Sequence, residues 1–245
     1  VKVMQPSGIV NYSDLARGIT YAAAKGAHVI NLSVGGYANS RTLQTVIQNA
    51  AQTAVIIAGA GNDGVATPFY PAAYPEVLAV AATDETGQRA AFSNFGAWVD
   101  LAAPGVNMIT TFDGGSWGAA AGTSVAAPVV SGVAGLVKTL HPDWTAQQIA
   151  AHLRQTAAAL VARAGGELGA GLVDAANAVQ PPQPAFAVDG YALNDRAGGA
   201  VAPNSTGNQL VMQLRNTWFD AGDVQAQLTS PDPVSYTHLR AHETV

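Results

Sequence analysis

Short apolar runs alternate with amphipathic stretches along residues 1–179. The runs are rich in valine, isoleucine and alanine, which is typical of strands buried on both faces. We interpret four of them as strands, at residues 1–4, 28–33, 55–58 and 77–82. This alternation predicts an α/β domain of three layers, in which helices cover a mostly parallel sheet.

The helices between these strands have recognisable ends. Ser13 is the expected N-cap of a helix that runs to Ala24, with Gly26 at its stop position. A second helix is expected from Ser40 or Arg41 to Gln52, with Leu43, Val46 and Ile47 on its apolar face. Thr145 and Gln148 have the spacing of a capping box and predict a further helix.

The pattern changes beyond residue 179. Residues 180–184 are Pro-rich and predict a stiff linker. Within 185–233 apolar residues occupy every second position of 210–214 and 224–228, which predicts the first strands of a truncated β-sandwich-like accessory domain. Residues 234–245 resemble one reading frame of a transposase-based sequencing-library adapter, and we expect them to belong to neither domain.

Composition excludes several classes of function. The 245 residues are 49% hydrophobic and 11% charged, enough apolar material for one sizeable core. A net charge of -5 without a basic stripe argues against a nucleic-acid partner. Cysteine is absent, so disulfides and thiolate metal sites are excluded. The longest apolar run, Val129–Val137, is shorter than the roughly 18 residues of a membrane span, and none is expected.

Three segments carry candidate chemistry. Ser124 lies in the segment 122–128 at the start of an expected helix, where free amides favour negative charge, although a plain helix cap has the same pattern. Asn62 stands among glycines after the strand 55–58 and could act as a side-chain donor or serve the turn. The strand within 30–36 ends in glycines and could pair with an extended peptide.

In this order and spacing, the segments resemble the subtilisin family of serine endopeptidases. The resemblance spans residues 1–179 and includes the motifs at 92–96, 103–106 and 169–174. It implies that Ser124 attacks the scissile carbonyl, while Asn62 and the backbone N–H of Ser124 bind the oxyanion. It also implies that two edges hold the substrate, one formed by Gly8, Ile9 and Val10 and the other by Ser33, Val34 and Gly35. By the same resemblance, Tyr12 closes an apolar subsite and Phe69 lies at the base of the specificity pocket. Phe69 is expected to favour small or medium side chains over aromatic ones there.

The resemblance also bears on ligands and location. It implies polypeptide substrates, a monomeric secreted protein and no cofactor for the chemistry. A family loop suggests that the carbonyls of Ala72, Tyr74 and Val77 hold a structural calcium or sodium ion, although a Pro-rich turn explains this loop equally well. The Tyr70–Pro71 bond is the expected position of a cis peptide.

The catalytic Asp and His of the family precede the Ser in chain order, and neither segment is recognisable here. Other roles explain the five histidines better: His28, His141, His152, His238 and His242. We therefore expect an inactive C-terminal part of a serine endopeptidase. The alternatives are a catalytically dead binding domain of the same fold and an α/β-hydrolase esterase. The esterase motif Gly-x-Ser-x-Gly is not met, because Ala126 stands two residues after Ser124.

Overall fold

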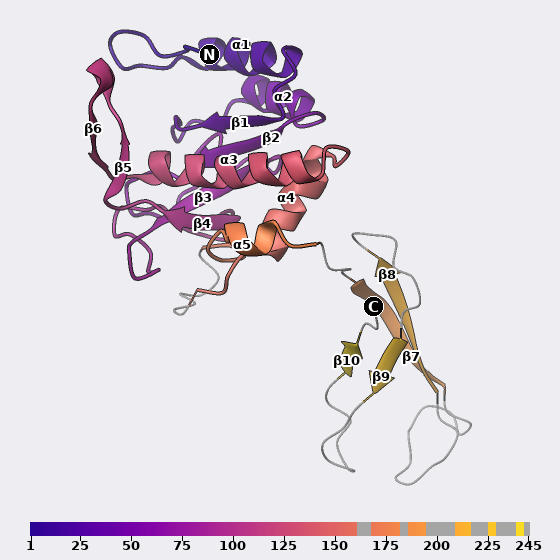
Figure 1. Ribbon diagram of the computed structural model, residues 1–245. Coiled ribbons are helices and arrows are strands. Elements are labelled where there is room, and N and C mark those ends of the chain that lie inside the picture. Colours follow the sequence, from indigo (N-terminus) through magenta and orange to yellow (C-terminus); the bar gives the residue numbers. More distant parts are fainter. Residues whose placement is uncertain (161–167, 182–185, 195–208, 217–224, 229–238, 243–245) are drawn as a thin grey trace. The chain divides into compact units, whose positions relative to one another are not determined.

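The computed structural model divides the chain into two compact units, Val1–Gln180 and Pro181–Val245 (Figure 1). It describes residues 1–160, 168–181, 186–194, 209–216, 225–228 and 239–242, with side chains described up to residue 181.

The first unit is built on a sheet of four parallel strands in the order β1-β2-β3-β4. Their bounds are Val29–Leu32, Val55–Gly59, Val77–Thr83 and Leu101–Pro104. Every residue of β2 and β3 is buried. The sheet confirms the predicted parallel α/β architecture, and β4 is a strand that the apolar pattern did not identify.

Helices cover both faces of this sheet (Figure 1). On one face, α1 (Tyr12–Ala24) and α2 (Arg41–Ala50) pack against alternate strand residues such as Ile56 and Ala79. On the other face, α3 (Thr123–Leu140), α4 (Ala146–Gln155) and α5 (Ala175–Ala178) pack against the intervening residues, such as Ile57 and Val80. The strands therefore have two buried faces, as three layers require.

Two details near the amino terminus differ from expectation. Residues 1–4 form no strand; Val3 packs against α1 instead, at Gly18, where a side chain would collide with Val3. An apolar run has the same composition whether it pairs in a sheet or lies on a helix. Helix α1 begins at Tyr12 with Asn11 as N-cap, not Ser13.

Three other predicted helix boundaries are observed, whereas α2 ends at Ala50 and not at Gln52. Gly26 has a φ of 79°, Ser40 caps α2 by accepting from the N–H of Leu43, and Thr145 and Gln148 form a complete capping box at α4. Helix α3 meets the length and composition of a membrane span. Within the first unit it is a core helix, and its inner residues pack on the sheet.

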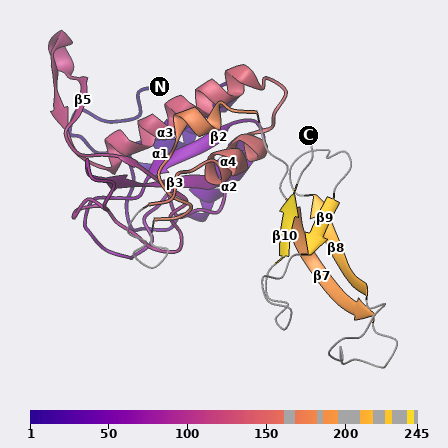
Figure 2. The same cartoon turned by 60° about the horizontal axis from the view of Figure 1, so that its bottom comes forward.

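A two-stranded hairpin precedes α3. Strands β5 (Met108–Thr111) and β6 (Trp117–Ala120) pair antiparallel across a short 3-10 turn, η1 (Asp113–Gly115). The hairpin projects from the body of the first unit in both ribbon views (Figures 1 and 2). Strand β6 ends two residues before Gly122, so the hairpin leads directly into the segment that carries Ser124.

The second unit contains two antiparallel strand pairs. Strand β7 (Phe186–Asn194) pairs with β8 (Gln209–Asn216), and β9 (Gln225–Leu228) pairs with β10 (Leu239–His242). The predicted alternation at 210–214 and 224–228 coincides with β8 and β9. Strand β10 lies within the stretch expected to be adapter-derived, and residues 182–184 of the expected linker lie outside the described residues. The assignment of the linker, accessory domain and tail stays a prediction.

Candidate active site

The site lies where the carboxyl end of β2 meets the amino end of α3. Thr123 and Ser124 are the first two residues of α3, after Gly122 with its φ of 149°. The helix approaches the sheet closely at Gly59, where an added Cβ would lie 2.8 Å from the Thr123 carbonyl oxygen. Only glycine permits this contact, which fixes the height of Ser124 above the strand.

The side chain of Asn62 is held by Thr123. Its Oδ1 accepts hydrogen bonds from the Thr123 backbone N–H at 2.8 Å and from the Thr123 hydroxyl at 3.0 Å. The hydroxyl in turn accepts from the N–H of Gly61 at 3.0 Å. Because the oxygen of the amide faces these donors, its Nδ2 group is turned the other way.

Ser124 and the Asn62 amide converge on one point beside Gly122. A Cβ added to Gly122 would lie 2.9 Å from Ser124 Oγ and 3.5 Å from Asn62 Nδ2. The N–H of Ser124 belongs to the first turn of α3, whose amides have no partner inside the helix. A hydroxyl group and two N–H donors, from the Asn62 amide and the Ser124 backbone, are thus brought together.

A second network holds the backbone of Ser124. Pro128 lies inside α3 and has no N–H for the Ser124 carbonyl. Ser33, just after β1, donates its hydroxyl to that carbonyl at 2.7 Å. Asn31 donates to Ser33 at 2.9 Å and accepts from Ser131 of α3 at 3.1 Å. Ser33 therefore supplies the hydrogen bond that proline removes.

Asn94 braces the loop that carries Asn62. Its side chain is fully buried and donates to the Ala60 carbonyl at 3.0 Å and to the Tyr37 hydroxyl at 3.2 Å. Its Oδ1 accepts from the N–H groups of Asp63 at 3.0 Å and Val65 at 3.2 Å. The motif at 92–96 contains Asn94, but the sequence alone gave this residue no role.

Residues of the two expected substrate edges line one cavity. A cavity of about 240 Å³ is lined by Gly8, Val10, Tyr12, Val34 and Gly35, with Met4 and Leu15. Tyr12 is fixed by donating its hydroxyl to the Ala38 carbonyl at 2.6 Å. Ile9 is not among the lining residues and is 58% exposed. The structure thus groups two of the predicted segments around one apolar hollow.

The loop proposed to bind a cation contains the expected cis peptide, Tyr70–Pro71. The Tyr74 carbonyl already accepts from the Val77 N–H at 3.0 Å. In the described part of the chain no group of three His, Asp or Glu side chains is arranged to hold a metal. Binding by the carbonyls of Ala72, Tyr74 and Val77 therefore stays a prediction.

The histidines with described side chains lie elsewhere. His28 is exposed before β1, and His141 stacks on Trp144 with ring centroids 3.9 Å apart. His152 is buried with Nε2 2.9 Å from the Ala178 carbonyl, and burial lowers the pKa of its imidazole. The side chains of His238 and His242 lie outside the described residues.

A serine at a helix terminus, with an aligned amide donor at the edge of an α/β sheet, is an arrangement that hydrolases with an oxyanion hole use. The chain belongs to the subtilase family, whose profile matches residues 1–211.

Similar proteins agree with this assignment. The chain is 43% identical over 161 residues to M-protease of Shouchella clausii, covering 65% of this chain and 42% of that protein. It is 42% identical to subtilisin Savinase of Lederbergia lenta, covering 65% of this chain and 60% of that protein. A protease structure from Pseudoalteromonas arctica matches with a TM-score of 0.69 and 35% identity, over 73% of this chain and 61% of that one. The chain therefore spans about half the length of the relatives it matches.

Proposed function

We propose that the protein is a serine endopeptidase acting by acyl transfer through Ser124. The observation that carries the proposal is the alignment of Asn62 by Thr123, which directs an amide donor to the place where Ser124 Oγ reacts. Attack of Oγ on a peptide carbonyl would form a C–O bond and place negative charge on the carbonyl oxygen. Asn62 Nδ2 and the Ser124 N–H would bind that charge, and water would later release the acyl group.

This chemistry needs a base to take the proton from Ser124 Oγ and return it to the leaving amine. Ser33 contacts the backbone carbonyl of Ser124 and not its Oγ, so this contact supplies no base. We infer that the 245-residue chain by itself hydrolyses peptides at no useful rate. The base would come from the Asp and His segments of the family. If those residues are replaced in the full gene, the protein is a catalytically dead binding domain.

The substrates that this proposal implies are polypeptides held as an extended strand. Gly8–Val10 and Ser33–Gly35 would pair with its backbone, and the hollow beside Tyr12 would take an apolar side chain further along it. By relation to M-protease and subtilisin Savinase, we also propose a secreted, monomeric enzyme. A calcium or sodium ion at the loop 70–77 would serve structure and not the reaction.

Labelling with a fluorophosphonate tests the proposal. The purified chain should label slowly, whereas protein expressed with the coding sequence upstream of Val1 should label rapidly and stoichiometrically at Ser124 and cleave peptides. Ser124→Ala in the longer protein should abolish both. Rapid labelling of the short chain would show that it contains a base. Absence of labelling in a folded longer protein with an intact Asp and His would refute the assignment of Ser124.

A further inference from the structure

An aromatic ring fills the space between the carboxyl ends of β1 and β2. A Cβ added to Gly35 would lie 2.4 Å from Phe69 Cε1, and one added to Gly61 would lie 3.0 Å from Phe69 Cγ. The ring of Phe69 therefore lies between these two glycines. Gly61, which follows β2, directly precedes Asn62. Little room remains there for a second aromatic ring.

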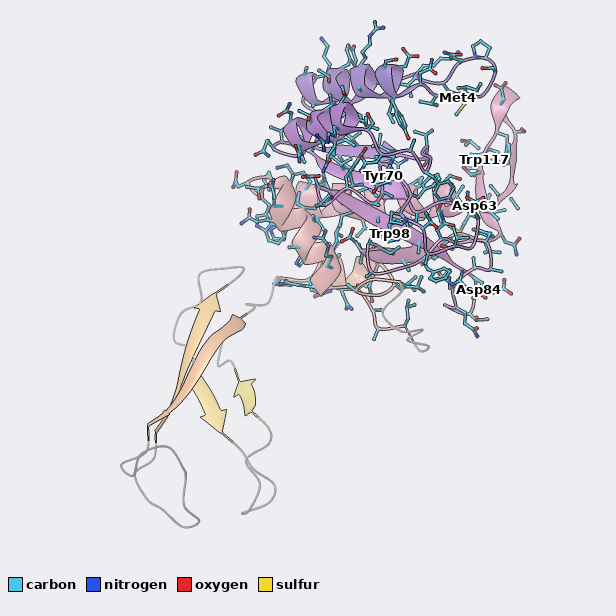
Figure 3. The ribbon with its side chains drawn as sticks, turned by 180° about the vertical axis from the view of Figure 1, so that it is seen from behind. Met4, Asp63, Tyr70, Asp84, Trp98 and Trp117 are labelled. Carbon is cyan, nitrogen blue, oxygen red and sulfur yellow. The ribbon has the colours of Figure 1, made fainter. Side chains whose placement is uncertain are left out.

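Tyr37 packs against this ring and reaches a carboxylate. Its ring meets Phe69 edge-on, with centroids 5.1 Å apart and planes at 80°. Its hydroxyl donates to Oδ2 of Asp63 and accepts from Nδ2 of Asn94 at 3.2 Å. Figure 3 marks Asp63 at the end of the sheet where the strands terminate. Tyr37 is 44% exposed, so it forms the outer wall of the filled space.

The charge of Asp63 is matched by a neutral donor. Arg154 with Asp100 is the single ion pair in the described part of the chain, so the partner that Asp63 has there is the phenol. Desolvation, and then the hydrogen bond to Asp63, raise the pKa of Tyr37 above its ordinary value. A basic side chain entering this space would have to displace the phenol from the carboxylate.

We propose that Tyr37 is a specificity-determining residue, which binds Asp63 and holds Phe69 in place, so that the space between Gly35 and Gly61, next to Asn62, accepts small, uncharged side chains. The inference rests on the proposed function, because it concerns the residue that precedes the cleaved bond. Size and charge are selected by different contacts: Phe69 excludes large rings, and Tyr37 removes Asp63 as a partner for lysine or arginine.

Product-like peptides test this without needing a catalytic base. Three acetylated tetrapeptides with free carboxyl termini, differing only in a final Ala, Lys or Phe, are titrated into the 245-residue chain by calorimetry or NMR. We expect the Ala peptide to bind best to the wild type. Tyr37→Phe keeps the ring but loses the hydroxyl, and should raise the affinity of the Lys peptide relative to Ala by about 2–5-fold, the range of an exposed ion pair.

Three further variants separate the contacts. Tyr37→Phe combined with Asp63→Asn should return the Lys-to-Ala ratio to the wild-type value. Phe69→Gly should raise the Phe-to-Ala ratio about 5–150-fold and leave the Lys-to-Ala ratio unchanged. Tyr21→Phe, at an exposed position of α1, should change neither ratio.

A Lys-to-Ala ratio that Tyr37→Phe leaves at the wild-type value would overturn the inference. So would an equal change for all three peptides, or a folded wild type that binds none of them. Failure of this inference can be told apart from failure of the proposed function. If the peptides bind with the expected ratios but Ser124 is not labelled in the longer protein, the proposed enzymatic activity is refuted and the assignment of Tyr37 remains.

Discussion

Replacing Asn94 with alanine tests whether the loop that carries Asn62 depends on one buried amide. The substitution removes two donors and two acceptor contacts from a side chain that is fully buried. The Ala60 carbonyl belongs to a residue with no exposed surface, so it would lose its donor without gaining water. The N–H groups of Asp63 and Val65 belong to exposed residues and can turn to solvent.

These differences set the size of the effect. An orphaned buried carbonyl costs about 1–3 kcal/mol, and a hydrogen bond exchanged for water about 0.5–1.5 kcal/mol. We therefore expect Asn94→Ala to lower the free energy of unfolding of the first unit by about 2–6 kcal/mol. This is a large part of the roughly 5–15 kcal/mol typical of a domain, but a folded protein should remain.

Urea denaturation followed by tryptophan fluorescence measures this change. Asn39→Ala is the matched control, because it makes the same chemical change at an exposed residue whose Oδ1 accepts one hydrogen bond, from Tyr74. In the longer, active protein the same Asn94 variant should lower kcat much more than it changes KM, since the loop positions a donor for the transition state. A stability within 0.5 kcal/mol of the Asn39 variant would refute the bracing role.

Three other predictions follow from contacts at the site and in the core. In the active protein, Asn62→Ala should lower kcat by the range established for an oxyanion donor of subtilisin, about 10²–10³-fold, and steady-state kinetics showing a loss of affinity instead would contradict its role. Ser33→Ala should lower the free energy of unfolding by about 1–3 kcal/mol. The loss should be smaller in a Pro128→Ala background, because the new N–H can donate to the Ser124 carbonyl. A double-mutant cycle measured by urea denaturation that shows no coupling would contradict this. Because burial lowers the pKa of His152 in the folded state, stability should be full above the ordinary value of about 6.5 and fall as the pH drops below it; His152→Leu should flatten this profile, measured by denaturation between pH 7.5 and 5.

The elements that could be predicted from the sequence are those whose buried residues form short, continuous apolar runs. Strands β2 and β3 are buried on both faces, so their residues are apolar throughout. The hairpin of β5 and β6 has exposed and half-buried residues, with Trp117 73% exposed, and offers no apolar run to recognise.

The site shows the same division. Ser124 and Asn62 stand in local motifs, and resemblance of those motifs was enough to pair them. Asn94 and Tyr37 are 57 residues apart and act through contacts that folding creates, so neither could be assigned from its neighbours in the chain. Neither the sequence motifs nor the contacts of the described residues identify a general base.

The close contact between the amino end of α3 and the sheet limits which substitutions this protein can tolerate. Besides Gly59, Gly105 lies against the helix, and a Cβ there would lie 2.9 Å from the Gly122 carbonyl oxygen and 3.3 Å from the Cβ of Ala126. At this end of α3 the helix meets the sheet through backbone atoms and small side chains, so little can yield there when a residue grows. Any enlargement would pass directly to the spacing of Ser124 and Asn62. Libraries intended to alter substrate selectivity should therefore vary Tyr37 and Phe69 and leave Gly59 and Gly105 unchanged. Variants at these two glycines would lose activity before they gained a new substrate.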